Sequence, residues 1–207
     1  MWGDEGMKKS VVCLLLLCCL SLGVQAVEHS AKSAILVDLG SGRVLYEYNA
    51  DEERLIASIT KLMTALVAVE SVQDISETVE IKAEWTGAEG SSLYLEAGQR
   101  WTLETLLYGL LLHSGNDAAI AIAGYCAGDV ETFVEWMNQR AEDLGMERTS
   151  FQNPNGLNHE AHYSTARDMA RLAAACMENE VVAKIVATKS ISLEGRFCQP
   201  QQAFVAI

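Results

Sequence analysis

Two short motifs carry side chains that could do chemistry together. The first is Ser58-Ile59-Thr60-Lys61, which places a hydroxyl and an amine three residues apart. Side chains at this spacing share one face of a helix, with Cβ atoms about 5 to 6 Å apart. A serine becomes a good nucleophile when a neighbouring base takes its proton, and lysine can be that base if its pKa falls well below about 10.4. The motif predicts a lysine-activated serine; the alternative is a capping serine beside a solvated lysine.

The second motif is Ser114-Gly115-Asn116, where two predicted helices meet. A second hydroxyl beside a carboxamide could relay a proton and bind a substrate amide. The alternative is a plain turn between helices. The sequence therefore predicts an active site in which Ser58, Lys61 and Ser114 are catalytic and Asn116 binds substrate.

Histidine does not offer a better site. His159-x-x-His162 has a spacing that can chelate zinc, but no further histidine or cysteine follows in a ligand-like pattern. No Gly-x-Ser-x-Gly elbow is present, so a serine-histidine triad through His113 or His162 has no support. We predict neither a metal ion nor a cofactor.

Apolar periodicity predicts the elements that must position these motifs. A buried helix is expected over residues 58–69, a second over 102–113 and a third over 118–127, the last capped by Asp117. The remaining expectations are a hairpin of strands 33–38 and 43–48, a short strand 79–82, a loop 89–99 without a role, helices over 129–144 and 180–187, a turn-rich loop 151–157, and a helix capped by Ser164.

Composition limits the class of protein. The chain has 207 residues, is 50% hydrophobic and carries a formal net charge of −13, which argues against nucleic acid as a partner. Lys8-Lys9, the apolar run 11–22 and Val24-Gln25-Ala26 have the order of a secretory signal peptide. We therefore expect residues 1–26 to be removed and the protein to be exported to the cell envelope, where no membrane anchor is evident. Cys126, Cys176 and Cys198 do not form a disulfide framework.

With both motifs and this order of elements, the chain resembles the low-molecular-mass penicillin-binding D-alanyl-D-alanine carboxypeptidases, within the penicillin-recognising serine enzymes. Residues 151–157 and His162-Tyr163-Ser164-Thr165-Ala166-Arg167-Asp168-Met169-Ala170 also look like this family, and the resemblance covers about residues 31–193. It implies an α/β fold, an α+β sandwich in which an antiparallel sheet carries helices on both faces.

The resemblance also implies roles. Ser58 would be acylated, Lys61 would activate it, Ser114 would pass a proton toward the leaving group and Asn116 would bind the peptide amide. The implied substrate is a peptidoglycan stem peptide ending in D-Ala-D-Ala, with β-lactam antibiotics as acylating mimics.

The family's third motif, Lys-Thr-Gly on a strand lining the site, does not occur in the sequence. We therefore expect residues 27–193 to be an incomplete domain with later strands missing, residues 194–207 to be an atypical tail, and the 207 residues alone to have little activity. A serine β-lactamase and a non-catalytic remnant of the family are the alternatives.

Overall fold

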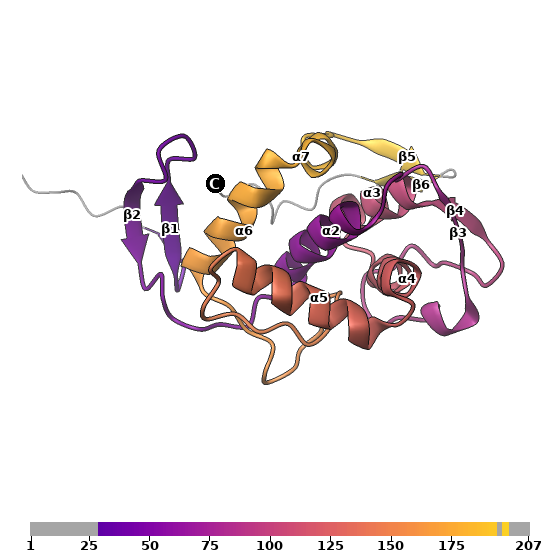
Figure 1. Ribbon diagram of the computed structural model, residues 1–207, viewed down its shortest axis with the longest axis horizontal. Helices are drawn as coiled ribbons and strands as arrows, with labels where there is room; N and C mark the ends of the chain where they lie inside the picture. The colour runs from indigo at the N-terminus through magenta and orange to yellow at the C-terminus, as the bar shows by residue number, and fades with distance from the viewer. Residues whose placement is uncertain (1–28, 194–195, 199–207) are drawn as a thin grey trace, which may run out of the picture. The chain divides into compact units, whose positions relative to one another are not determined.

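The computed structural model describes residues 29–193 and 196–198 (Figure 1). The predicted signal peptide and most of the predicted tail lie outside these residues. A hairpin comes first: β1 (Ala34–Val37) pairs antiparallel with β2 (Val44–Tyr48), as predicted. Its turn is closed by Asp38, whose carboxylate accepts the Ser41 N–H at 3.0 Å.

The central element is α2 (Thr60–Ser71), which follows a single 3-10 turn, η1 (Ala57–Ile59). It packs against α3, α4, α5, α6 and α7, and Figure 1 shows it running between them. Eight of its twelve residues are buried, which confirms the predicted core helix. The helix begins two residues later than predicted, so Ser58 lies in the 3-10 turn that leads into it.

Two leucine- and alanine-rich helices form the corner that carries the second motif. They are α3 (Leu103–His113) and α4 (Asn116–Ala127). Thr102 caps α3 by accepting the Thr105 N–H at 3.1 Å. The prediction that Asp117 caps α4 is wrong: the helix begins at Asn116 with Gly115 at its N-cap, and the Asp117 carboxylate faces a loop instead.

The remaining helices surround α2 on its other sides. They are α5 (Val130–Asp143), α6 (Ala166–Glu178) and α7 (Glu180–Val186). Ser164 does not cap α6, because its hydroxyl pairs with that of Thr149 at 2.7 Å and its backbone still pairs with Arg54. Thr165 takes that place and accepts the Asp168 N–H at 3.1 Å.

The other strands form two further antiparallel pairs. β3 (Thr78–Glu80) pairs with β4 (Arg100–Thr102), and β5 (Ile191–Leu193) pairs with β6 (Arg196–Cys198); a short 3-10 turn, η2 (Ala83–Trp85), follows β3. Helices and antiparallel strands together give the α/β class that was predicted. Within residues 29–193 and 196–198, no helix is both long and apolar enough to cross a membrane.

Candidate active site

The first motif brings its two reactive groups together. Lys61 lies in the first turn of α2, and its Nζ donates to Ser58 Oγ across 3.4 Å. Ser58 is partly exposed, so a substrate can approach its hydroxyl, whereas Lys61 is completely buried. The alternative of a solvated lysine beside a capping serine does not describe this geometry, because Ser58 caps no helix here.

Burial changes the acid-base chemistry of Lys61. Desolvation disfavours the ammonium form and lowers the pKa of Lys61 from its ordinary 10.5 to about 8. Its second partner is the backbone carbonyl of Asn155, 2.5 Å from Nζ. A neutral amine has two N–H donors and one lone pair. When one N–H donates a hydrogen bond to the Asn155 carbonyl, the lone pair can still accept the proton of the Ser58 hydroxyl.

Residues 153–156, which lie about 90 residues further along the chain, form the loop that contacts Lys61 and Thr64 of α2. Thr64, one turn further along α2, donates to Pro154 O at 2.6 Å, which fixes the loop against the helix. Asn153 Oδ1 accepts the Gly156 N–H at 2.7 Å and so closes the turn. The sequence resemblance included this loop, but no signal in the sequence identified Asn155 as a partner of Lys61, because any residue has a carbonyl oxygen.

The second motif lies at the corner between α3 and α4. Ser114 is 3% exposed and has a left-handed backbone, with φ +59°. Within the described part of the chain its hydroxyl forms no hydrogen bond, and none joins the second motif to Ser58 or Lys61. Asn116 is 6% exposed and donates from Nδ2 to Glu89 O at 2.6 Å, which leaves its Oδ1 as an acceptor.

Asp117 organises the loop beside this corner, and sequence analysis missed that role. Its carboxylate accepts four hydrogen bonds, from Ser92 Oγ at 2.6 Å and from the N–H groups of Leu93, Leu95 and Ala118 at 2.9 Å each. The loop therefore runs across the start of α4, where Ser91 O accepts the Asn116 N–H at 2.7 Å. Residues 89–99, predicted as a loop without a role, anchor Asn116 from both its side chain and its backbone.

The two histidines whose spacing could chelate zinc, His159 and His162, do not have the arrangement of a metal site. His159 is exposed, whereas His162 is 2% exposed and uses both ring nitrogens in hydrogen bonds to Thr60 and Gln152. Residues 29–193 contain no group of three or more histidine, cysteine or acidic side chains placed to hold a metal ion.

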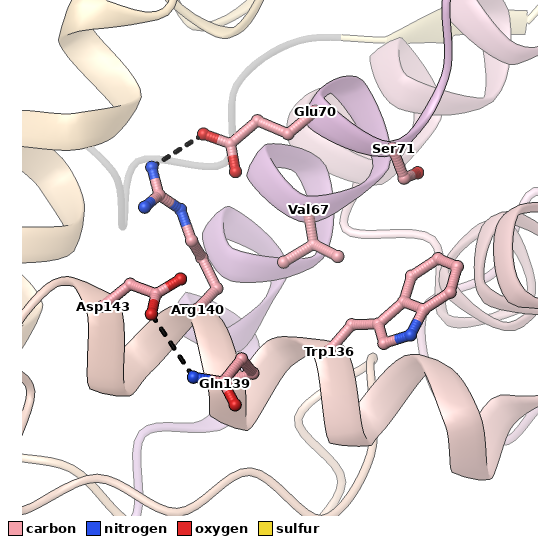
Figure 2. Close-up of a pocket in the computed structure, with 7 residues that line it drawn as sticks. All are labelled: Val67, Glu70, Ser71, Trp136, Gln139, Arg140 and Asp143. Atoms are coloured by element: carbon pink, nitrogen blue, oxygen red, sulfur yellow. Dashed lines mark hydrogen bonds and ion pairs between the residues drawn. The ribbon is translucent and has the colours of Figure 1, made fainter.

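A shallow pocket lies elsewhere, between α2 and α5 (Figure 2). Val67, Glu70 and Ser71 line it from the last turns of α2, whereas Ser58 precedes the first turn. In Figure 2 the Arg140 side chain reaches across to Glu70, and the two form an ion pair at 2.8 Å. The pocket is therefore separate from the candidate active site.

Comparison with known proteins now assigns the chain to a family. The sequence pattern of the family described as D-alanyl-D-alanine carboxypeptidase matches residues 21–203. The chain belongs to that family. It is similar to D-alanyl-D-alanine carboxypeptidase DacF of Bacillus subtilis (strain 168), with 40% identity over 166 residues, which cover 78% of this chain and 43% of DacF.

Solved structures of related proteins have the same fold. The chain matches penicillin binding protein 6B from Escherichia coli with a TM-score of 0.82 and 30% identity, over 88% of this chain and 61% of the other. It matches the D-alanyl-D-alanine carboxypeptidase of Mycobacterium tuberculosis H37Rv with a TM-score of 0.81 and 33% identity, over 87% and 70%. The predicted penicillin-binding fold is confirmed, and the chain spans less than half the length of its relative DacF.

Proposed function

We propose that this chain forms the acylating part of a serine D-Ala-D-Ala carboxypeptidase, with Ser58 as the nucleophile. The observation that supports this most strongly is the 3.4 Å contact between Ser58 Oγ and the buried amine of Lys61. A lysine whose pKa is about 8 has a neutral fraction at neutral pH and can act as a base. Membership of the carboxypeptidase family supports the same assignment.

In the proposed reaction, neutral Lys61 takes the Ser58 proton as Oγ attacks the carbonyl carbon of the penultimate D-alanine. The tetrahedral intermediate collapses when the C–N bond to the terminal D-alanine breaks, and the leaving amine takes a proton. Water then hydrolyses the ester on Ser58 and frees the shortened peptide. Each step conserves protons without an added cofactor.

The second motif would serve the leaving group and the peptide. Ser114 has a hydroxyl without a hydrogen bond to the described residues, so it is available to pass the proton from Lys61 to the leaving amine. Asn116 holds its amide nitrogen on Glu89 O, which directs Oδ1 toward an incoming N–H donor. We infer that a peptidoglycan stem peptide ending in D-Ala-D-Ala occupies this site at the cell envelope, and that β-lactams acylate Ser58 as mimics.

Covalent labelling tests the nucleophile directly. Because little activity is expected from the 207 residues alone, the chain is extended with a family-type C-terminal segment that carries the Lys-Thr-Gly strand, and this extended chain is the unchanged reference in every acylation test below. It is incubated with a fluorescent penicillin, digested, and mapped by mass spectrometry, and we expect the adduct on Ser58. The Ser58→Ala variant loses the adduct, whereas Ser71→Ala, a change at the other end of α2, keeps it. An adduct that persists in Ser58→Ala, or no adduct in the extended chain without substitutions, would overturn the proposal.

The β-lactamase alternative differs in the second half of the reaction. Both enzymes acylate, but a β-lactamase releases hydrolysed penicillin quickly, whereas a carboxypeptidase keeps the adduct and releases D-alanine from a D-Ala-D-Ala peptide. Gly115 in the second motif and the loop 151–157 support the carboxypeptidase. Measuring adduct lifetime and D-alanine release on the same sample distinguishes the two, and a non-catalytic remnant would show neither.

A further inference from the structure

A buried histidine far along the chain contacts the turn that carries the nucleophile. His162 Nε2 lies 2.7 Å from Thr60 Oγ1, and its Nδ1 accepts the Gln152 N–H at 3.1 Å. Thr60 Oγ1 also lies 2.7 Å from Ala57 O and can only donate to that carbonyl. Thr60 has one hydroxyl proton, so toward the histidine it must accept. His162 is therefore the neutral tautomer with its proton on Nε2.

These bonds form a chain that ends at the peptide before the nucleophile. The order is Gln152 N–H to His162 Nδ1, His162 Nε2–H to Thr60 Oγ1, and Thr60 O–H to Ala57 O. Ala57 has a left-handed backbone, with φ +45°, a conformation that costs an alanine roughly 1 to 2 kcal/mol. The carbonyl at the end of the chain thus belongs to a strained residue that needs support to keep its geometry.

The same loop also packs against this carbonyl. Gly156 lies so close that a Cβ there would be 2.0 Å from Ala57 O, and its φ of +82° favours glycine. The Phe151 ring packs edge-on against the His162 ring, with centroids 5.8 Å apart, so the imidazole cannot turn freely. The loop 151–162 therefore contacts the segment 57–60, which includes Ser58, at two places: Gly156 in its middle and His162 at its end.

We propose that His162 is a positioning residue, which acts through Thr60 to hold the Ala57–Ser58 peptide where the Ser58 hydroxyl meets Lys61. The proposal rests on the proposed function, because its consequence is measured as acylation of Ser58. His162 does not exchange a proton with substrate, since Thr60 and Gln152 occupy its two nitrogens. Burial lowers the pKa of His162 to about 4, helped by nearby His159, so the ring stays neutral and the chain of bonds stays intact at neutral pH.

Four variants in two matched pairs separate positioning from simple stability. Glutamine at position 162 can place an N–H donor near the Nε2 position, whereas asparagine is too short to reach Thr60. Serine at position 60 keeps the hydroxyl, whereas valine removes it with little change in volume. We expect His162→Asn and Thr60→Val to slow acylation by penicillin roughly 10- to 100-fold, as a misplaced reacting group does. His162→Gln and Thr60→Ser should stay within about fivefold of the unchanged chain.

Val67→Ala is the control for lost stability. Val67 is buried on the same helix, but it lines the pocket between α2 and α5 rather than the candidate active site. We expect it to lower the melting temperature about as much as Thr60→Val while changing acylation less than threefold. In the slowed variants, the first-order rate constant of acylation at saturating penicillin should fall, whereas the penicillin concentration that gives half of that rate should stay the same.

Two readouts do not depend on catalysis. Nitrogen NMR of the His162 ring should show a proton on Nε2 alone from pH 8 to pH 5. Amide exchange at Ile59, whose N–H donates to Ile56 O in the nucleophile turn, should be faster in His162→Asn and Thr60→Val than in their partners. If the unchanged protein is not acylated, the proposed function fails. The ring NMR and the amide exchange still test whether the hydrogen bonds from Gln152 to Ala57 are present. Equal acylation in His162→Asn and His162→Gln, or a proton on Nδ1, would overturn the positioning role.

Discussion

The two sides of the candidate site are held by opposite means. On the nucleophile side the functional groups themselves are bonded: Lys61 contacts both Ser58 and Asn155, and Thr60 is bonded at both ends. On the other side the Ser114 hydroxyl has no hydrogen bond to the described residues, and Asn116 is held by the loop that the Asp117 carboxylate fixes. For the proposed function this means that one side is arranged before substrate arrives, whereas the other keeps a hydroxyl and an amide oxygen free to bind it.

This difference indicates where mutations act. A change on the nucleophile side alters reactive atoms that already touch, so it should affect the rate of acylation directly. A change around Asp117 alters a loop that supports Asn116, so it should affect stability first. The predictions below test this comparison in order of expected effect.

The largest effect is expected for Lys61→Arg. Arginine keeps the positive charge but stays protonated at any working pH, so it cannot accept the Ser58 proton. Loss of general base catalysis should lower the acylation rate by about 10² to 10⁴. Stopped-flow or gel-based penicillin labelling measures this, with Lys184→Arg as the control, because Lys184 lies at the surface and pairs with Glu104. Normal labelling in Lys61→Arg would mean that another group is the base.

Next is the pH dependence of acylation in the unchanged chain. The pKa of Lys61 is lowered to about 8, so the fraction of neutral amine rises about tenfold per pH unit below pH 8 and levels off above it. Acylation should therefore be roughly 50-fold faster at pH 8 than at pH 6. Rates measured at constant ionic strength, with the melting temperature recorded at each pH, test this. A rate that is flat from pH 6 to pH 9 would exclude Lys61 as the base.

Asp117→Asn should chiefly lower stability. The carboxylate accepts four hydrogen bonds, two on each oxygen, and an asparagine amide would turn an NH₂ group toward two of those donors. Because hydrogen bonds to a charged group contribute about 1.5 to 3 kcal/mol, we expect a loss of about 2 to 4 kcal/mol in the free energy of unfolding. Urea denaturation measures it, and Asp129→Asn, at the exposed cap of α5, should lower the free energy of unfolding clearly less. Equal losses in the two variants would show that the 92–95 loop is not held by Asp117.

The sequence predicted those parts of the site that depend on contacts between residues close together in the chain. Ser58 and Lys61 are three residues apart, and local helical geometry alone brings such side chains into contact. Helices and the first hairpin were predicted because apolar periodicity and turn glycines act locally. The motif pairing came from family resemblance, and comparison with known proteins confirmed the family.

What the sequence did not reveal is long-range and partly made by backbone atoms. The partner of Lys61 is the carbonyl of Asn155, which has no residue-specific signal. His162 was considered as a metal ligand or triad member, and its contact with Thr60 was not predicted because the two residues are 102 positions apart. Asp117 follows Gly115-Asn116 and precedes an apolar run, the pattern of a cap, and only the fold shows that its carboxylate faces the 92–95 loop. Burial in the fold, rather than the residue types, decides these roles.

The smallest effect is expected for substitutions of Ser114, which test how the second side of the site is held. A left-handed serine is strained by roughly 1 to 2 kcal/mol, and glycine removes that strain but has more conformational entropy to lose on folding. We therefore expect Ser114→Gly to raise the free energy of unfolding by about 0.5 to 1 kcal/mol. Ser114→Ala keeps the strain and removes a hydroxyl without a hydrogen bond to the described residues, so it should change stability by less than about 0.5 kcal/mol. Both variants should slow D-alanine release, because both lose the proposed relay. Urea denaturation of the three proteins measures the difference. If Ser114→Gly is no more stable than Ser114→Ala, the corner stores no strain, and the open side of the site is held by the Asp117 loop alone.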